Sequence, residues 1–205
     1  MKKEGKIMAQ TEITVQLFED IKNVFTKLET LGFKWKDTFT GIDQYFTTLS
    51  PEQVKSASYK ELLDNSIIIR EFDKASTNTH QTMLVHKKKT LDSQNKVIGE
   101  EKTSLVIDNS TTASKMLTNA GLVNWMTLSQ QNSFYTSGEK TVIAGTVKGL
   151  NGSFIEIEEY ESIKDLSEKE KFNKLCEFVD SLGFNHGDDY SCKKIYMLYQ
   201  NQNNK

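Results

Sequence analysis

Several segments of this chain alternate strictly between apolar and polar residues, and their polar faces carry charge. In residues 11–17, three aliphatic side chains share one face, and Glu12, Thr14 and Gln16 share the other. In residues 153–160, Glu156 and Glu158 lie on one face opposite two isoleucines. A period of two residues indicates β-strands. Their apolar faces must be buried, and their charged faces must stay hydrated or paired, because an unpaired buried charge is costly.

The same alternation extends over most of the chain. Strands are predicted at 11–17, 33–39, 42–47, 67–72, 82–88, 97–107, 123–131, 133–136, 141–147 and 153–160, with a turn near Gly41. Helical spacing predicts helices at 18–31, 112–120 and 167–182, a short helix opening at Pro51, and one or two helical turns at 193–199. We therefore predict an α+β fold, a closed antiparallel β-barrel of about eight strands with helices packed outside. An open sheet with its polar face in water fits the same periodicity.

Length and composition bound the class of protein. The 205 residues suit one domain, placed at 11–199 between a flexible segment at 1–10 and a frayed tail at 200–205. The net charge is −2, from 26 basic and 28 acidic residues, so neither polymeric nucleic acid nor a membrane is an expected partner. The chain has no apolar run long enough to cross a membrane, no signal-peptide pattern and only two cysteines. These features predict a cytoplasmic protein.

One segment resembles a known motif. Residues 149–158 read GLNGSFIEIE, similar to the G-L-G-x-F-x-E-I-E stretch of the CYTH superfamily, which includes class IV adenylyl cyclases and thiamine triphosphatases. Shorter pieces occur in the family's order between residues 12 and 198: LGF at 31–33, IDQYF at 42–46, IR at 69–70, LVHK at 84–87, EE at 100–101, Tyr135, and KIY at 194–196. The last piece and the Gly-Leu turn resemble the class IV cyclase branch most.

The resemblance implies a triphosphate tunnel, in which lysines and arginines hold a polyphosphate and glutamates hold Mg²⁺ or Mn²⁺. Matched residue by residue, the basic positions keep Arg70, Lys87 and Lys194, and three others are replaced by Gln16, Gln130 and Asn132. The acidic positions keep Glu12, Glu101, Glu156 and Glu158, and three others are replaced by Thr14, Thr103 and Gly145. Both signs of charge are lost together, and the replacements are mostly neutral and polar.

These losses predict a less negative ligand than a triphosphate. A triphosphate carries about four negative charges, and each charge-assisted hydrogen bond contributes ~1.5–3 kcal/mol, so losing three cations argues against a full triphosphate site. We predict a phosphorylated, nucleotide-type small molecule held by the matched basic and polar positions. At most one Mg²⁺ or Mn²⁺ is expected, on Glu156 and Glu158 with Glu12 as a further candidate ligand. Arg70, the only arginine, is the first candidate for phosphate contact, and a structural ion pair with a neighbouring Glu is its alternative.

Three functions fit these residues. The first is an enzyme, a metal-dependent cyclase, lyase or phosphohydrolase, in which Glu12 or Glu101 acts as base. The second is a binder that captures a nucleotide signal without turnover, or a lyase or phosphodiesterase acting on such a signal. The third is a scaffold, favoured if hydrophobic side chains fill the barrel. In each case the chain is expected to be a monomer or a homodimer.

Overall fold

The computed structural model describes residues 11–91 and 97–203, and their side chains except at 89–91 and 97–100. The expected flexible segment 1–10 lies outside the described residues. The strands are β1 (Glu12–Leu17), β2 (Lys34–Thr47), β3 (Ser66–Lys74), β4 (Thr79–Leu91), β5 (Val97–Ile107), β6 (Val123–Ser137), β7 (Lys140–Val147) and β8 (Ser153–Glu158). The helices are α1 (Ile21–Thr30), α2 (Pro51–Ser56), α3 (Tyr59–Asp64), α4 (Ser110–Asn119), α5 (Glu168–Ser181) and α6 (Lys194–Asn203), with a 3₁₀ turn, η1, at Glu161–Ile163.

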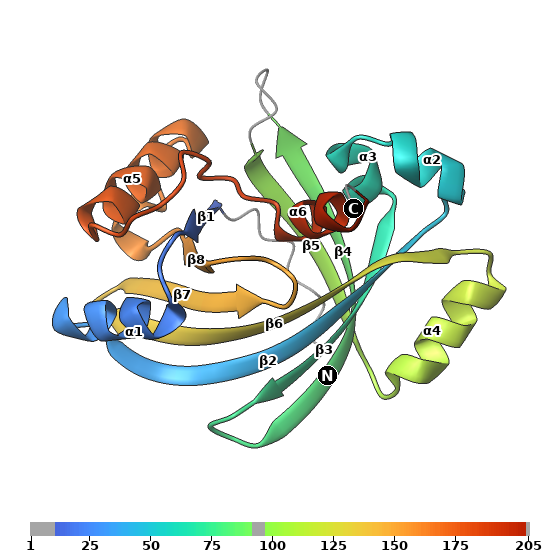
Figure 1. The fold of residues 1–205 in the computed structure, drawn as a ribbon, viewed down its shortest axis with the longest axis horizontal. Coiled ribbons are helices and arrows are strands. Elements are labelled where there is room, and N and C mark those ends of the chain that lie inside the picture. Colours follow the sequence, from blue (N-terminus) through green and yellow to red (C-terminus); the bar gives the residue numbers. More distant parts are fainter. Residues whose placement is uncertain (1–10, 92–96, 204–205) are drawn as a thin grey trace.

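The eight strands form one strongly curved antiparallel sheet in the order β1-β8-β7-β6-β2-β3-β4-β5 (Figure 1). This confirms the α+β class and the number of strands. The order places β1 and β5 at opposite ends, and within the described residues no ladder joins them. The sheet is therefore not closed by hydrogen bonds, and the predicted barrel closure is not confirmed. Helix α5 contacts both end strands.

The segment before α6 lies along the free edge of β1. The Thr14 amide donates to the Tyr190 carbonyl oxygen at 3.1 Å, and the Cys192 amide donates to the Thr14 carbonyl oxygen at 2.9 Å. Backbone groups at a sheet edge need partners, and this segment supplies them. It also leads the chain into α6, which lies over the concave side of the sheet in Figure 1. We call this concave side the inner face.

The outer face carries the main hydrophobic core. Ile13, Val15 and Leu17 of β1 are almost fully buried there, as the alternation of residues 11–17 predicts. They pack in one cluster with residues of α1 and α5, among them Leu28 and Leu175. Burying these apolar faces is the chief stabilising contribution to the sheet and fixes which side of each strand faces inward.

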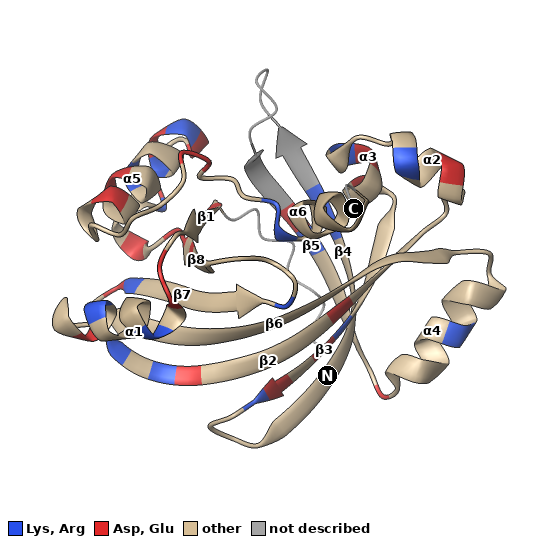
Figure 2. Ribbon diagram, in the orientation of Figure 1, with Lys and Arg blue, Asp and Glu red and all other residues tan. Residues whose placement is uncertain are grey.

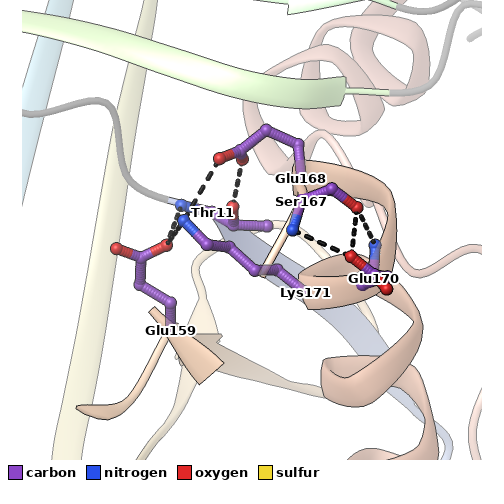
Figure 3. A network of polar contacts seen from close by, with 6 residues as sticks. All are labelled: Thr11, Glu159, Ser167, Glu168, Glu170 and Lys171. Carbon is purple, nitrogen blue, oxygen red and sulfur yellow. Dashed lines mark hydrogen bonds and ion pairs between the residues drawn. The ribbon is translucent and has the colours of Figure 1, made fainter. Parts of the chain in front are cut away.

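A polar network ties the start of β1 to α5 (Figure 3). The Lys171 ammonium, on a side chain only 9% exposed, contacts Glu159 at 2.9 Å and Glu168 at 3.2 Å. The Thr11 hydroxyl also donates to Glu168, and the Thr11 amide donates to Glu159 at 3.3 Å. A capping box formed by Ser167 and Glu170 starts the helix. This network holds the strand that carries Glu12 against its supporting helix.

A second hydrophobic cluster fills one end of the inner face. It contains Tyr45, Val85 and Leu128 from the sheet and Ile195 and Leu198 from α6. Helix α6 therefore covers that end of the inner face. Only part of the inner face is apolar, so the condition for the scaffold hypothesis, a hydrophobic interior, is met in part.

Two predicted strand pairs are each one strand. The predicted strands 33–39 and 42–47 are parts of the continuous β2, and the predicted strands 123–131 and 133–136 are parts of the continuous β6. The predicted turn near Gly41 is wrong, because Gly41 pairs with Phe72 on one side and Gln130 on the other. Ladders on both sides keep the strand extended through the glycine. Helix α6 continues to Asn203, into the segment expected to be a frayed tail.

Candidate functional site

A cavity of about 520 Å³ lies on the inner face beside the start of α6. Figure 2 shows the basic residues at that point of the chain. The charged residues that line it are Glu12, Asp43, Arg70, Lys87, Lys102, Glu156, Glu158, Lys193 and Lys194. Gln130, Asn132 and Tyr59 are among its other lining residues. Side chains from all eight strands, from α3 and from the start of α6 therefore converge on one polar space, although they are far apart in the sequence.

Strand register explains this convergence. In the β1–β8 ladder, Glu12 pairs with Glu158 and Thr14 pairs with Glu156, so these side chains share the inner face. Alternation then places every second residue of each strand on the same side. The polar faces read from the sequence are thus the faces that line the cavity.

Arg70 forms a two-point ion pair with Asp43 across the β2–β3 ladder. Its Nε donates to Oδ1 at 2.7 Å and its Nη2 donates to Oδ2 at 2.5 Å. The Asp43 side chain is 2% exposed and that of Arg70 is 23% exposed. Burial alone would lower the pKa of Arg70, but the Asp43 carboxylate raises it above its ordinary value, with a smaller contribution from Glu156. The guanidinium is therefore held in place as a permanent cation.

The alternative of a structural ion pair for Arg70 is thus realised with an aspartate instead of a glutamate. Asp43 was not among the predicted site residues. The signal for it lies in β2, where alternation puts Asp43 on the same face as Tyr45, a residue of the inner cluster.

Lys194 forms the second ion pair of the cavity. Its ammonium donates to Glu156 and, at 2.8 Å, to Oε1 of Gln130. The Lys194 side chain is 13% exposed and that of Glu156 is 19% exposed. Burial opposes ionisation of Glu156, but Lys194, Lys87 and Arg70 outweigh it and lower the pKa of this carboxyl. Glu156 is therefore an anion surrounded by cations.

Two of the positions that the resemblance assigns to opposite charges are neighbours in the structure. Asn132 and Gly145 are direct partners in the β6–β7 ladder, so the basic and acidic positions that they replace face each other. A Cβ atom at residue 145 would meet Oδ1 of Asn132 and the Gln131 carbonyl oxygen well inside van der Waals contact. The Asn132 amide thus leans over the glycine. The Asn132 side chain therefore occupies the space that a side chain at position 145 would need.

Most predicted site residues reach the cavity. Its lining includes Glu12, Arg70, Lys87, Gln130, Asn132, Glu156, Glu158 and Lys194. Gln16 and Glu101 are not among the described lining residues. Gln16 instead donates to the Asn151 carbonyl oxygen at 2.9 Å, near a separate surface groove.

Glu101 is exposed on the outer face of β5. Its neighbours Lys102 and Ser104 line the cavity instead. When a strand is matched to a family motif with an error of one residue, every side chain is assigned to the wrong face of the sheet. This explains why Glu101 was expected in the cavity and lies outside it. Lys102, Lys193 and Tyr59 are lining residues that sequence reasoning missed.

The carboxylates do not form a preassembled metal site. In the part of the chain that the structure describes, no three His, Cys, Asp or Glu side chains are grouped to hold a metal ion. Glu156, one of the two predicted ligands, is paired with Lys194. The residue opposite Glu156 is Thr14, which has no carboxylate to add. Glu156 therefore does not fit the role of metal ligand that the sequence resemblance implies.

Comparisons with known proteins give the class of the fold. No family model and no curated protein match the chain. Solved structures do: the PH1819 protein of Pyrococcus horikoshii OT3 is 18% identical, with a TM-score of 0.64 over 86% of this chain and 93% of that one. HpAC1 of Hippeastrum, a candidate adenylyl cyclase with a dominant triphosphatase activity, is 17% identical, with a TM-score of 0.62 over 95% and 96%. A candidate adenylate cyclase of Vibrio parahaemolyticus is 11% identical, with a TM-score of 0.58 over 90% and 94%.

The chain thus shares its fold with these solved proteins, two of which are candidate adenylyl cyclases. This likeness of fold agrees with the resemblance found in the sequence. The identities are low, and the likeness concerns the fold. Among the described residues, no helix combines the length and the apolar character needed to cross a membrane.

Proposed function

We propose that the cavity binds a small nucleotide-type ligand whose phosphate carries little charge. The observation that carries the proposal is the balance of the described lining residues, which comprise five basic and four acidic side chains. A single negative charge on the ligand balances the one cation in excess. A triphosphate, with about four negative charges, would leave a partly enclosed site strongly negative, which is unfavourable away from bulk water.

The arrangement of donors supports a phosphate at the centre of this site. Arg70 has five N–H donors, and Asp43 accepts from two of them. Because Asp43 fixes the guanidinium, Arg70 can meet an oxyanion without first being ordered. Gln130 and Asn132 add neutral hydrogen-bonding groups at positions where the tunnel fold places cations. Together these groups suit an anion of low charge.

An aromatic side chain at the same cavity supports a nucleotide as the ligand class. Tyr59 of α3 lines the cavity, and its ring lies 5.7 Å from that of Tyr196, centroid to centroid. The Lys193 ammonium lies 4.8 Å from the Tyr59 ring centroid. Aromatic rings beside a basic groove are stacking surfaces for bases. Solved structures with this fold also include candidate adenylyl cyclases.

A lyase or phosphodiesterase acting on such a ligand is the second candidate. Glu12 lines the cavity directly opposite Glu158 in the β1–β8 ladder. A carboxylate at this position can act as a general base towards a ligand hydroxyl or a water molecule. Mass spectrometry of the ligand after incubation separates this candidate from simple binding. Saturable binding with an unchanged ligand mass favours the binder. A product that forms with the wild-type chain and does not form with the Glu12→Gln variant favours the enzyme.

Calorimetric titration with 3′,5′-cyclic AMP tests the proposed function. We expect saturable binding by the wild-type chain. Lys87→Gln removes a cavity cation and should weaken binding about tenfold or more, as expected for the loss of one charge-assisted hydrogen bond. Lys88→Gln, its neighbour on the outer face of β4, is the matched control and should bind as the wild type does. Equal effects of the two substitutions would contradict the assignment of the cavity.

The role of Arg70 needs a variant that stays folded. Arg70→Ala alone leaves the buried Asp43 carboxylate unpaired, so a loss of binding could reflect unfolding. The double variant R70Q/D43N removes both charges and leaves a polar side chain at each position. We expect it to fold, as measured by circular dichroism, and to lose binding of cyclic AMP. A folded double variant that binds normally would remove Arg70 from the site.

A further inference from the structure

We propose that this cavity works without a divalent metal, because the ammonium of Lys194 takes the place of a metal cation on Glu156. The inference rests on the proposed function, since it concerns the same site, but it departs from the metal-dependent chemistry that the tunnel fold implies. It assigns to Lys194 the part of a built-in counter-ion. The charge that a metal would bring to the phosphate is then covalently attached to α6.

The position of Lys194 is the first argument. Its ammonium contacts the Glu156 carboxylate and donates to Oε1 of Gln130 at 2.8 Å. An ammonium has three N–H donors, and these contacts use two of them. The third can reach an oxygen of a phosphate in the cavity. A metal ion shared between a glutamate and a phosphate would have the same neighbours.

The charges around Glu156 are the second argument. Lys194, Lys87 and Arg70 all act on this carboxylate and stabilise its ionised form. A divalent ion at Glu156 would have to displace the first of these cations and sit beside the other two. Like charges at such distances repel strongly in a partly buried site. The surroundings of Glu156 therefore favour the ammonium over the metal.

The missing partner carboxylate is the third argument. Mg²⁺ in proteins is held by one or two carboxylates together with ligand oxygens and water. The residue facing Glu156 across the β1–β8 ladder is Thr14, which is nearly buried and neutral. The next pair along the ladder, Glu12 and Glu158, lies one step of the inner face away. The site thus offers Glu156 no second acidic ligand at its own level.

Titration with Mn²⁺ alone tests the inference without any nucleotide. Electron paramagnetic resonance, which counts free Mn²⁺, should show no saturable binding at the cavity of the wild-type chain. Lys194→Met should bind Mn²⁺ with an affinity at least about tenfold above any residual binding by the wild-type chain, because one positive charge is removed from the site. Adding Glu156→Gln to that variant should abolish the gain. Lys88→Met, which removes the same charge outside the cavity, should show no gain.

Two results would overturn the inference. One is saturable Mn²⁺ binding by the wild-type chain that Glu156→Gln abolishes. The other is a folded Lys194→Met variant that gains no Mn²⁺ binding. Should that variant unfold, Lys194→Gln replaces it, since glutamine removes the same charge and leaves a polar side chain at this position.

A second titration separates this inference from the proposed function. Cyclic AMP is titrated into the wild-type chain in EDTA and in excess MgCl₂, and we expect affinities that agree within about twofold. Binding in MgCl₂ alone would refute metal independence and leave the proposed function standing. Binding in neither buffer would refute the proposed function for this probe, whereas the Mn²⁺ experiment would still decide the role of Lys194.

Discussion

Removing the partner of Arg70 is the substitution whose consequence follows most directly from the structure. Asp43→Asn keeps the shape of the side chain and removes its charge. The Arg70 guanidinium then remains in a site where its side chain is only 23% exposed, without the carboxylate that accepts two of its hydrogen bonds. Breaking a buried pair in this way costs about 3–5 kcal/mol. We expect the lower end, about 3 kcal/mol, because the arginine is partly hydrated.

The assay is the free energy of unfolding from urea titration, with the melting temperature as a second measure. For a chain of this length, a loss of about 3 kcal/mol lowers the melting temperature by roughly 6–12 °C. Asp73→Asn is the control, because the Asp73 side chain is 69% exposed although it pairs with His80. It should change stability by less than about 0.5 kcal/mol. R70Q/D43N should be more stable than the sum of its single variants predicts.

The result that would refute this reasoning is a loss below about 1 kcal/mol for Asp43→Asn, which is the range of surface pairs. Strict additivity in the double-mutant cycle would refute it as well. Either outcome would mean that the two side chains are not coupled as the structure has them.

Three further predictions concern the supports of the site. Gly145→Ala should destabilise the fold by about 1–3 kcal/mol, because the added Cβ would meet Asn132 and a backbone oxygen. Gly41→Ala is the control and should cost less than about 1 kcal/mol, because the nearest atom to its added Cβ is 3.6 Å away. Equal urea midpoints for the two variants would contradict this prediction. The pKa of Glu156 is lowered by folding, so the stabilising effect of its charge is present above pH 4.5 and is lost as the pH falls further. The difference in free energy of unfolding between the wild type and Glu156→Gln should therefore shrink below that pH. A difference that stays constant with pH would contradict this prediction. Lys171→Met should lower the free energy of unfolding by about 1–3 kcal/mol. Lys174→Met should lower it by less than about 0.5 kcal/mol, because the Lys174 side chain is 51% exposed. Similar losses for the two variants would show that the network at the start of β1 does not stabilise the fold.

The inner face of the sheet was largely predictable from sequence, because alternation is a local property. The alternating residues of β1 and β8 lie as read, and the matched cations Arg70 and Lys87 reach the cavity. Glu101 was misplaced by one residue, although β5 itself was predicted. Alternation gives the two faces of a strand but not which face points inward, unless one face is clearly apolar. Residues 101–107 are exposed on nearly all sides, so β5 lacks that signal.

Features that depend on pairing between distant strands could not be read from the sequence. Asp43 and Arg70 become partners only through the β2–β3 register, and Asn132 and Gly145 only through the β6–β7 register. The open order of the sheet and the placement of α6 over its inner face are also products of tertiary packing. Ile195 and Leu198 give α6 an apolar side, but nothing local shows what that side covers.

The affinity of the cavity along a series of increasing charge tests the central proposal most directly. Calorimetric titrations of cyclic AMP, AMP, ADP and ATP, in one buffer at one ionic strength, span about one to about four negative charges on a single base and sugar. We predict that affinity falls along the series, because the described lining residues have one positive charge in excess. Tightest binding by ATP would contradict the proposal and indicate an ordinary triphosphate site.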